Sequence, residues 1–291
     1  MIDVKRYSER IDVSERTIYE GIKFILFHFE KQQKLFPRTI KANKVAHQVK
    51  VEDESISQKS INKIFNKFKE SNYYDCKINC MPYNTADNQQ HGTDTNTIYK
   101  NKNKNTAPES FFILISLNLA DYSQSRKKLD LMLNTTLEKL SVKFYGDAYP
   151  TVLWNGNGYI IYQPLDGMVF EKHKTFYDFL QYADGRDLAT EFLRFAQDFF
   201  TNGNVPIKYL PSINSCFIDV PGTFNFENGE QVKIIQKWNG KRPSIQWITN
   251  DFKNYLIQKK IDKVHERKKE IEKKMSSYHQ QQDEQSYKYD L

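Results

Sequence analysis

Lysine and asparagine side chains follow one helical face between residues 57 and 70, and this face could bind a polyanion. Lys59, Lys63 and Lys67 are spaced four residues apart, and Asn62 and Asn66 lie beside them. Lysine ammonium groups neutralise phosphates, and asparagine amides can contact base edges. The face therefore predicts DNA binding, although an ordinary solvated helix has the same appearance. The opposite face is apolar and contains Ile61, Ile64, Phe65 and Phe68.

The three cysteines are the other side chains that could take part in chemistry. Cys76 and Cys80 have a C-x3-C spacing, and the nearest histidine is His91, in a polar stretch. A structural zinc needs four close ligands, which this set does not supply. We expect no metal site here, and we interpret the pair as small apolar residues on a strand. Because an odd number of cysteines implies no disulfide framework, a reducing compartment is expected.

The bulk composition favours a folded protein with a basic surface. The chain has 291 residues, 39% of them hydrophobic, and a formal net charge of +7. A basic excess favours polyanionic partners. The N-terminus has no apolar signal segment, and the longest apolar run, 111–117, is far shorter than the roughly 20 residues that span a bilayer. We therefore expect a cytoplasmic protein with no membrane partner.

The elements that must position the basic face suggest a small helical domain. Apolar spacing predicts helices over 15–35 and 39–51, a third helix capped by Ser57, and a strand over 73–81. Three short helices followed by a strand is the order of a winged helix, whose third helix enters the major groove. Residues 1–83 are therefore predicted to form a winged-helix-like DNA-binding module.

A polar linker follows, and then the pattern becomes alternating α and β. Residues 84–108 are rich in Asn, Thr, Lys and Gln and cannot bury a core. Strand-like runs at 151–154 and 159–162 surround the turn 155–158, which predicts a hairpin. Further strands are expected at 111–115, 216–220 and 232–236, and helices at 124–140, 186–201 and 250–275. We assign 109–258 to this second domain and 259–291 to a charged helix with a disordered tail from Ser276.

Several segments resemble the palm of the archaeo-eukaryotic primase (primase-polymerase) superfamily, in the order that this family uses. They are FFILISLNLADYS (111–123), PTVLWNGNGYIIYQPL (150–165), FIDVPGTFN (217–225) and VKIIQKWNGKRPSI (232–245). The resemblance implies an α/β fold class, an α+β primase-type palm with an RRM-like sheet. It also implies a nucleotidyltransferase active site and a role in DNA replication.

At the positions where the family binds metal and nucleotide, this sequence differs. The Asp-x-Asp motif, whose carboxylates hold divalent metals, is replaced by Ser116 and Asn118. The phosphate-contacting histidine is replaced by Ile160, and the third metal aspartate by Val205. The basic residue before Pro-Gly-Thr is replaced by Asp219. Asp121 is a nearby substitute carboxylate. The turn is retained, so the resemblance implies nucleotide-side contacts from Asn155, Gly156, Asn157, Gly158 and Tyr159.

These substitutions predict a nucleic-acid-binding, primase-polymerase-like protein of DNA replication or a mobile element that has lost catalysis and needs no cofactor. Its expected partners are DNA and a replication protein or an active primase. A second reading is a divergent active DNA primase-polymerase in which Asp121 and Asp219 hold Mg²⁺ or Mn²⁺. A third is a DNA-binding regulator. No GxxxxGK[ST] sequence is present, so no attached ATPase is expected.

Overall fold

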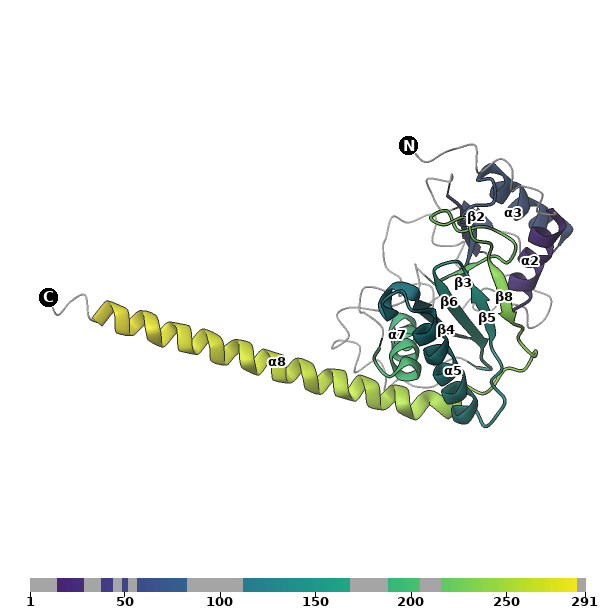
Figure 1. Ribbon diagram of the computed structural model, residues 1–291. Helices are drawn as coiled ribbons and strands as arrows, with labels where there is room; N and C mark the ends of the chain where they lie inside the picture. The colour runs from purple at the N-terminus through teal and green to yellow at the C-terminus, as the bar shows by residue number, and fades with distance from the viewer. Residues whose placement is uncertain are drawn as a thin grey trace, which may run out of the picture.

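The computed structural model describes residues 15–28, 38–43, 49–51, 57–82, 112–167, 188–204 and 216–286. Within these ranges the chain is a mixed α/β protein with five α-helices and two four-stranded sheets, in which all strand pairs are antiparallel (Figure 1). Buried side chains from both sheets form one continuous hydrophobic cluster. The sheets are therefore held together by a shared core.

The first sheet joins the N-terminal part of the chain to a strand from far along the sequence. Its order is β2 (Val49–Val51), β1 (Arg38–Lys41), β3 (Lys77–Pro82) and β7 (Phe217–Asp219). In the β3–β7 pair, Lys77 lies opposite Asp219. The predicted domain boundary at 84–108 lies outside the described residues, and segments on both sides of it contribute to this sheet.

Two helices pack with the first sheet. They are α2 (Glu15–His28) and α3 (Gln58–Glu70), whose N-terminus is capped by the Ser57 side chain. The apolar faces of α2 and α3 pack against each other. Gly21 of α2 lies close to the turn that follows β7. A Cβ added to Gly21 would be 2.0 Å from the Pro221 carbonyl oxygen. Only glycine permits this approach.

The prediction of a helix over 39–51 is wrong for the described residues, which form strands β1 and β2 with Ile40 opposite Val49. The spacing of Ile40, Val45, Ala46 and Val49 suggested a helix. However, Thr39, Ile40, Val49 and Val51 are β-branched and favour extended backbone. Pairing with β3 then supplies the hydrogen bonds that a helix would otherwise make. Strands therefore replace the second helix that a winged helix requires.

The second sheet contains three of the four segments that resemble the primase palm, whereas the fourth, 217–225, supplies β7 to the first sheet. Its order is β4 (Phe112–Asn118), β6 (Gly158–Pro164), β5 (Thr151–Trp154) and β8 (Lys233–Gln236). The predicted hairpin is confirmed, because β5 and β6 pair antiparallel with Trp154 opposite Tyr159. A short 3-10 helix, η2 (Leu119–Tyr122), follows β4.

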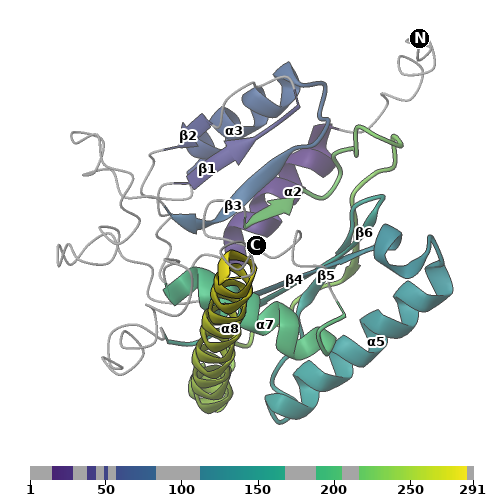
Figure 2. The same ribbon diagram turned by 90° about the vertical axis from the view of Figure 1, so that its left-hand side faces the viewer.

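Helices α5 (Arg126–Lys143) and α7 (Leu188–Thr201) lie together along the second sheet, and Figure 2 shows them on one side of it. The leucine spacing predicted α5, and Leu129, Leu133 and Leu140 are buried. The aromatic residues of α7 are buried with them, and Phe192 and Phe195 contact Phe252 of the C-terminal helix. These contacts fix the edge strand β4, which carries the first motif.

The C-terminal helix α8 (Gln246–Ser286) is the longest element, with 41 residues. Its first turns pack on the body through Ile248, Phe252 and Leu256. The helix then runs away from the body (Figure 1). It continues past Ser276, where the sequence predicted a disordered tail, because residues 276–286 contain no proline or glycine to end it. No helix among the described residues is long and apolar enough to cross a membrane.

Candidate functional site

Strand register gathers three of the motif positions at one end of the second sheet. Ser116 on β4 lies directly opposite Ile160 on β6, and Asn118 lies opposite Gly158. Residues that face each other across an antiparallel pair share one face of the sheet. Ile160 is buried, whereas Ser116 and Asn118 are partly exposed. The side chains at these positions are thus apolar or neutral, with no carboxylate among them.

A buried glutamine fixes the end of β4. The Ser116 backbone N–H donates to Oε1 of Gln197 at 2.8 Å, and Nε2 of Gln197 donates to the Ser116 carbonyl at 3.0 Å. Because β4 is an edge strand, this amide from α7 takes the place of a neighbouring strand. The sequence analysis did not find Gln197. The sequence feature that could have revealed Gln197 is its position as a polar residue next to Ala196, inside a helix face that is otherwise apolar and aromatic.

The turn between β5 and β6 is held by close backbone contacts. Gly156 has a φ of +91°, in the region that glycine adopts without strain. A Cβ on Gly158 would lie 2.0 Å from the Leu117 carbonyl oxygen. The Leu119 N–H donates to the Asn157 carbonyl at 2.8 Å and joins the turn to η2. The two glycines therefore serve both the tight turn and the packing of the hairpin on β4.

Side chains from residues 225–230 cover the outside of this turn. Asn225 Nδ2 donates to the Asn155 carbonyl at 2.9 Å, and Asn228 Nδ2 donates to the Gly156 carbonyl at 3.0 Å. Asn157 Nδ2 donates to Glu227 at 2.6 Å. These groups of the turn already bind partners within the chain. The predicted nucleotide contacts of the turn remain a prediction.

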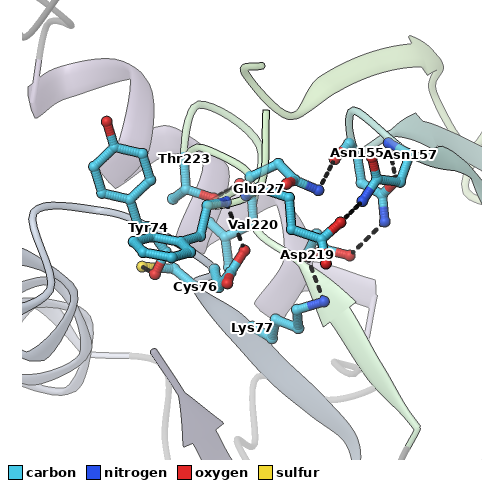
Figure 3. Close-up of polar contacts among 12 residues, drawn as sticks. Tyr74, Cys76, Lys77, Asn155, Asn157, Asp219, Val220, Thr223 and Glu227 are labelled. Atoms are coloured by element: carbon cyan, nitrogen blue, oxygen red, sulfur yellow. Dashed lines mark hydrogen bonds and ion pairs between the residues drawn. The ribbon is translucent and has the colours of Figure 1, made fainter. Parts of the chain in front are cut away.

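Asp219 lies where the two sheets meet, as Figure 3 shows. One carboxylate oxygen is 3.0 Å from Lys77 Nζ, and the other accepts from Asn155 Nδ2 at 3.2 Å. The Asp219 side chain is only 7% exposed. The Asp219 carboxylate, helped by Asp75 and Glu227, raises the pKa of Lys77 above its ordinary value. Asp219 is therefore charge-compensated, and it links β7 both to β3 and to the turn.

A cation and two aromatic rings form a second cluster beside the turn. The Arg126 guanidinium lies 3.7 Å from the centroid of the Trp154 ring and donates to the Tyr159 hydroxyl at 2.7 Å. That hydroxyl donates to Asp130 at 2.7 Å, and the Trp154 indole donates to Glu230 at 2.6 Å. Tyr159, predicted to contact nucleotide, is thus buried with its hydroxyl bound to α5. Cation–π contact of this kind stabilises the N-terminal turn of α5 against the hairpin.

The residues at the motif positions do not fit the divalent metals that the resemblance implies. Ser116 and Asn118 carry no charge, and Asp219 is already paired with Lys77. Asp121, the proposed substitute, lies on η2 and is partly buried, and Val205 lies outside the described residues. Within the described ranges, no group of three or more His, Cys, Asp or Glu side chains could hold a metal ion. Two-metal chemistry needs several carboxylate ligands, which the described residues at this end of the sheet do not offer.

The remaining residues that the sequence analysis singled out lie on other elements, on α3 and near β3. Lys59, Asn62, Lys63 and Asn66 are exposed on α3, so the basic face is open to solvent. Lys67 forms an ion pair with Glu70 at 2.8 Å, which offsets part of that charge. The thiols of Cys76, Cys80 and Cys216 are buried, and His91 lies outside the described residues.

Among the described residues, a groove of about 610 Å³ lies between α2 and β8, and none of the predicted site residues lines it. Its walls include Phe24, Phe27 and Ile234, with Arg16, Lys23 and Lys237 around them. It is an open groove of mixed character, separate from the turn. Comparison of the chain with protein-family models and with curated proteins found no match.

Proposed function

We propose that this chain is a nucleic-acid-binding protein built on a primase-polymerase-like palm, and that it does not catalyse nucleotidyl transfer. The observation that carries the proposal is the composition of the sheet end around Ser116 and Ile160. Three of the positions that resemble metal and phosphate ligands lie there, and they present neutral or apolar side chains. Asp219, a carboxylate that is hydrogen-bonded to the turn, is balanced by Lys77.

Catalysis of phosphoryl transfer depends on positioning and on charge neutralisation. Metal ions must neutralise the triphosphate and activate the attacking hydroxyl. Neutral hydroxyl and amide oxygens at 116 and 118 bind divalent cations more weakly than carboxylates do. Isoleucine at 160 cannot donate to a phosphate oxygen. The losses act on the same transition state, so little activity should survive them.

The proposed contact with DNA uses the exposed face of α3. Lys59 and Lys63 have solvated side chains, and Asn62 and Asn66 lie beside them. Strands β1 and β2 replace the second helix of a winged helix, so the proposal depends on this basic face and no longer on a helix-turn-helix arrangement. Phosphate contacts of this kind give salt-dependent affinity without strong sequence preference. A replication protein or an active primase would supply the missing chemistry.

Primer synthesis and primer extension with labelled nucleotides and Mn²⁺ test the proposal. We expect no extension by the purified chain. The opposing hypothesis is a divergent primase-polymerase that uses Asp121 and Asp219. It predicts extension that Asp121→Ala abolishes and that Asp262→Ala, on the exposed part of α8, leaves intact. Extension that survives Asp121→Ala and Asp219→Ala alike would point to a contaminating polymerase.

A further inference from the structure

The part of α8 beyond Leu256 carries a repeating apolar stripe. Positions 257, 261, 264, 268, 271 and 275 are separated alternately by four and three residues. All of them are apolar except Lys268. The exposed fractions are 42% for Ile261, 39% for Val264, 57% for Ile271 and 59% for Met275. Four exposed apolar side chains in regular array on one helix are unusual for a surface that meets only water.

This part of α8 also projects from the body. Figure 1 shows the helix leaving the globular part and continuing as a single rod. Residues 257–286 correspond to about 45 Å of helix at the ordinary rise per residue. Helices stabilised only by their own hydrogen bonds are marginal in water, and most need an apolar face that packs against something. The stripe is such a face.

The spacing identifies the kind of surface that would cover the stripe. A strict seven-residue repeat is the pattern of a left-handed coiled coil, in which the seam faces a partner helix of the same period. The seven positions between 259 and 274 on the side of the helix opposite the seam agree with this, since all of them are charged. They are Lys259, Asp262, Lys263, Glu266, Lys269, Glu270 and Lys273.

The residues that flank the seam indicate a second copy in parallel orientation. One flank is basic throughout, with Lys260, Arg267 and Lys274, and the other carries Gln258, His265 and Glu272. In a parallel pair, Arg267 of one helix faces Glu272 of the other, because flanking positions five residues apart meet across the seam. In an antiparallel pair the basic flanks would meet and repel. We propose that the chain forms a parallel two-stranded coiled-coil dimer through residues 257–278.

Lys268 gives the proposal its sharpest consequence. It is the one charged residue among the six seam positions, and in a parallel dimer it faces its own copy. A single polar residue at such a position weakens a coiled coil while favouring two strands over higher assemblies. The wild-type dimer is therefore of modest affinity, and removing this charge strengthens it.

The test measures the mass of the full-length chain by sedimentation over a range of concentrations. We expect a monomer–dimer equilibrium that Lys268→Ile shifts toward dimer by about tenfold or more in Kd. Lys269→Ile is the matched control, since it makes the same change one residue outside the seam and leaves Kd unchanged. Val264→Asp combined with Ile271→Asp should give a monomer with an unaltered unfolding transition of the body. A chain that stays monomeric even with Lys268→Ile, or equal effects of Lys268→Ile and Lys269→Ile, overturns the dimer.

Cross-linking tests the orientation. Ile271→Cys places identical thiols opposite each other in a parallel dimer, within reach of a disulfide. The native cysteines are buried and do not compete. Rapid oxidation to a covalent dimer supports the parallel arrangement, with Lys273→Cys, on the outer face, as the control that remains reduced. A dimer that Ile271→Cys does not cross-link any faster than Lys273→Cys contradicts it.

Discussion

Two regions of this molecule differ in which kind of side chain they bury and which they expose. Where the sheets meet, polar groups are buried and bound to one another, as in the contacts of Asp219 with Lys77 and Asn155. Along the outer half of α8, apolar groups such as Ile271 and Met275 are exposed. Internally satisfied polar groups stabilise a fold, whereas exposed apolar ones indicate contact with a partner. The comparison indicates that the polar groups at the sheet junction serve the fold, whereas the exposed apolar side chains of α8 suit contact with a partner.

The largest expected effect comes from reversing the charge at the sheet junction. Asp219→Arg restores the residue type that the primase resemblance implies, but it puts a guanidinium beside the Lys77 ammonium. We expect a loss of about 3–5 kcal/mol in the free energy of unfolding, measured by urea denaturation, because a buried ion pair is broken. Lys77→Glu in the same chain should recover part of the loss. A stable Asp219→Arg single variant would mean that the junction opens easily and that Asp219 is available to a ligand.

A pH effect of somewhat smaller size should arise at His28. The ring is 2% exposed, and its nitrogens lie 2.7 Å from the Phe24 carbonyl and 2.6 Å from the Thr151 hydroxyl. Burial lowers the pKa of His28 to about 4 from 6.5. Between these values the unfolded chain binds the proton and the folded chain does not. Stability is therefore complete above about pH 6.5 and falls as the pH drops toward 4, by up to roughly 3 kcal/mol.

Thermal unfolding at a series of pH values checks this. His28→Gln should flatten the dependence of the melting temperature on pH between 4 and 6.5, although the variant itself is less stable. His265→Gln, on the exposed part of α8, is the control and should keep the wild-type dependence. Parallel curves for wild type and His28→Gln would show that other groups govern acid unfolding.

Removing the Gln197 amide tests whether the first motif strand depends on α7. Gln197→Leu leaves the Ser116 N–H and carbonyl without their buried partner, so we expect a loss of about 1–3 kcal/mol in unfolding free energy. Hydrogen exchange should also become faster at Ser116. Gln246→Leu, at an exposed position, should change neither quantity. If hydrogen exchange at Ser116 is unchanged in the Gln197 variant, then the pairing of β4 with β6 alone accounts for the rigidity of β4.

The smallest and most specific expected effect concerns DNA affinity. Lys59→Ala, Lys63→Ala and Lys67→Ala together should weaken binding and reduce the slope of log affinity against log salt by about 2–3. The control replaces Lys127, Lys128 and Lys253, all exposed, with alanine and so removes the same charge elsewhere. Fluorescence anisotropy with a labelled duplex measures both. Equal weakening in the two triple variants would mean that net charge, and not α3, governs the interaction.

Elements whose signals are local could be predicted from the sequence. Two β-branched and aromatic runs around a Gly-rich turn were sufficient for the hairpin of β5 and β6, and leucine spacing was sufficient for α5. Strands β1 and β2 were missed because their stability comes from pairing with β3. Such pairing depends on residues far away in the chain, and short apolar spacings fit a helix equally well.

The motif positions could be singled out from the sequence, but the contacts of their side chains could not. Ser116 and Ile160 could be singled out by the motif resemblance, but the hairpin of β5 and β6 does not give the pairing of β4 with β6 that places them opposite each other. Asp219 was identified as the replacement of a basic residue, but the sequence contained no sign that Lys77 would lie beside it. Gln197 and Arg126 were not found for the same reason, since each acts through a contact between distant segments.

The β3–β7 pair has a consequence for the order in which the chain can fold during synthesis. Strand β3 ends at Pro82, but the strand that covers its outer edge is not made until Asp219. Until then an emerging chain presents the unpaired N–H and carbonyl groups of β3 to the cell. Open edges of this kind recruit other strands and promote aggregation. A fragment that stops at the 84–108 segment would keep that edge permanently, so the N-terminal residues should be expressed together with β7.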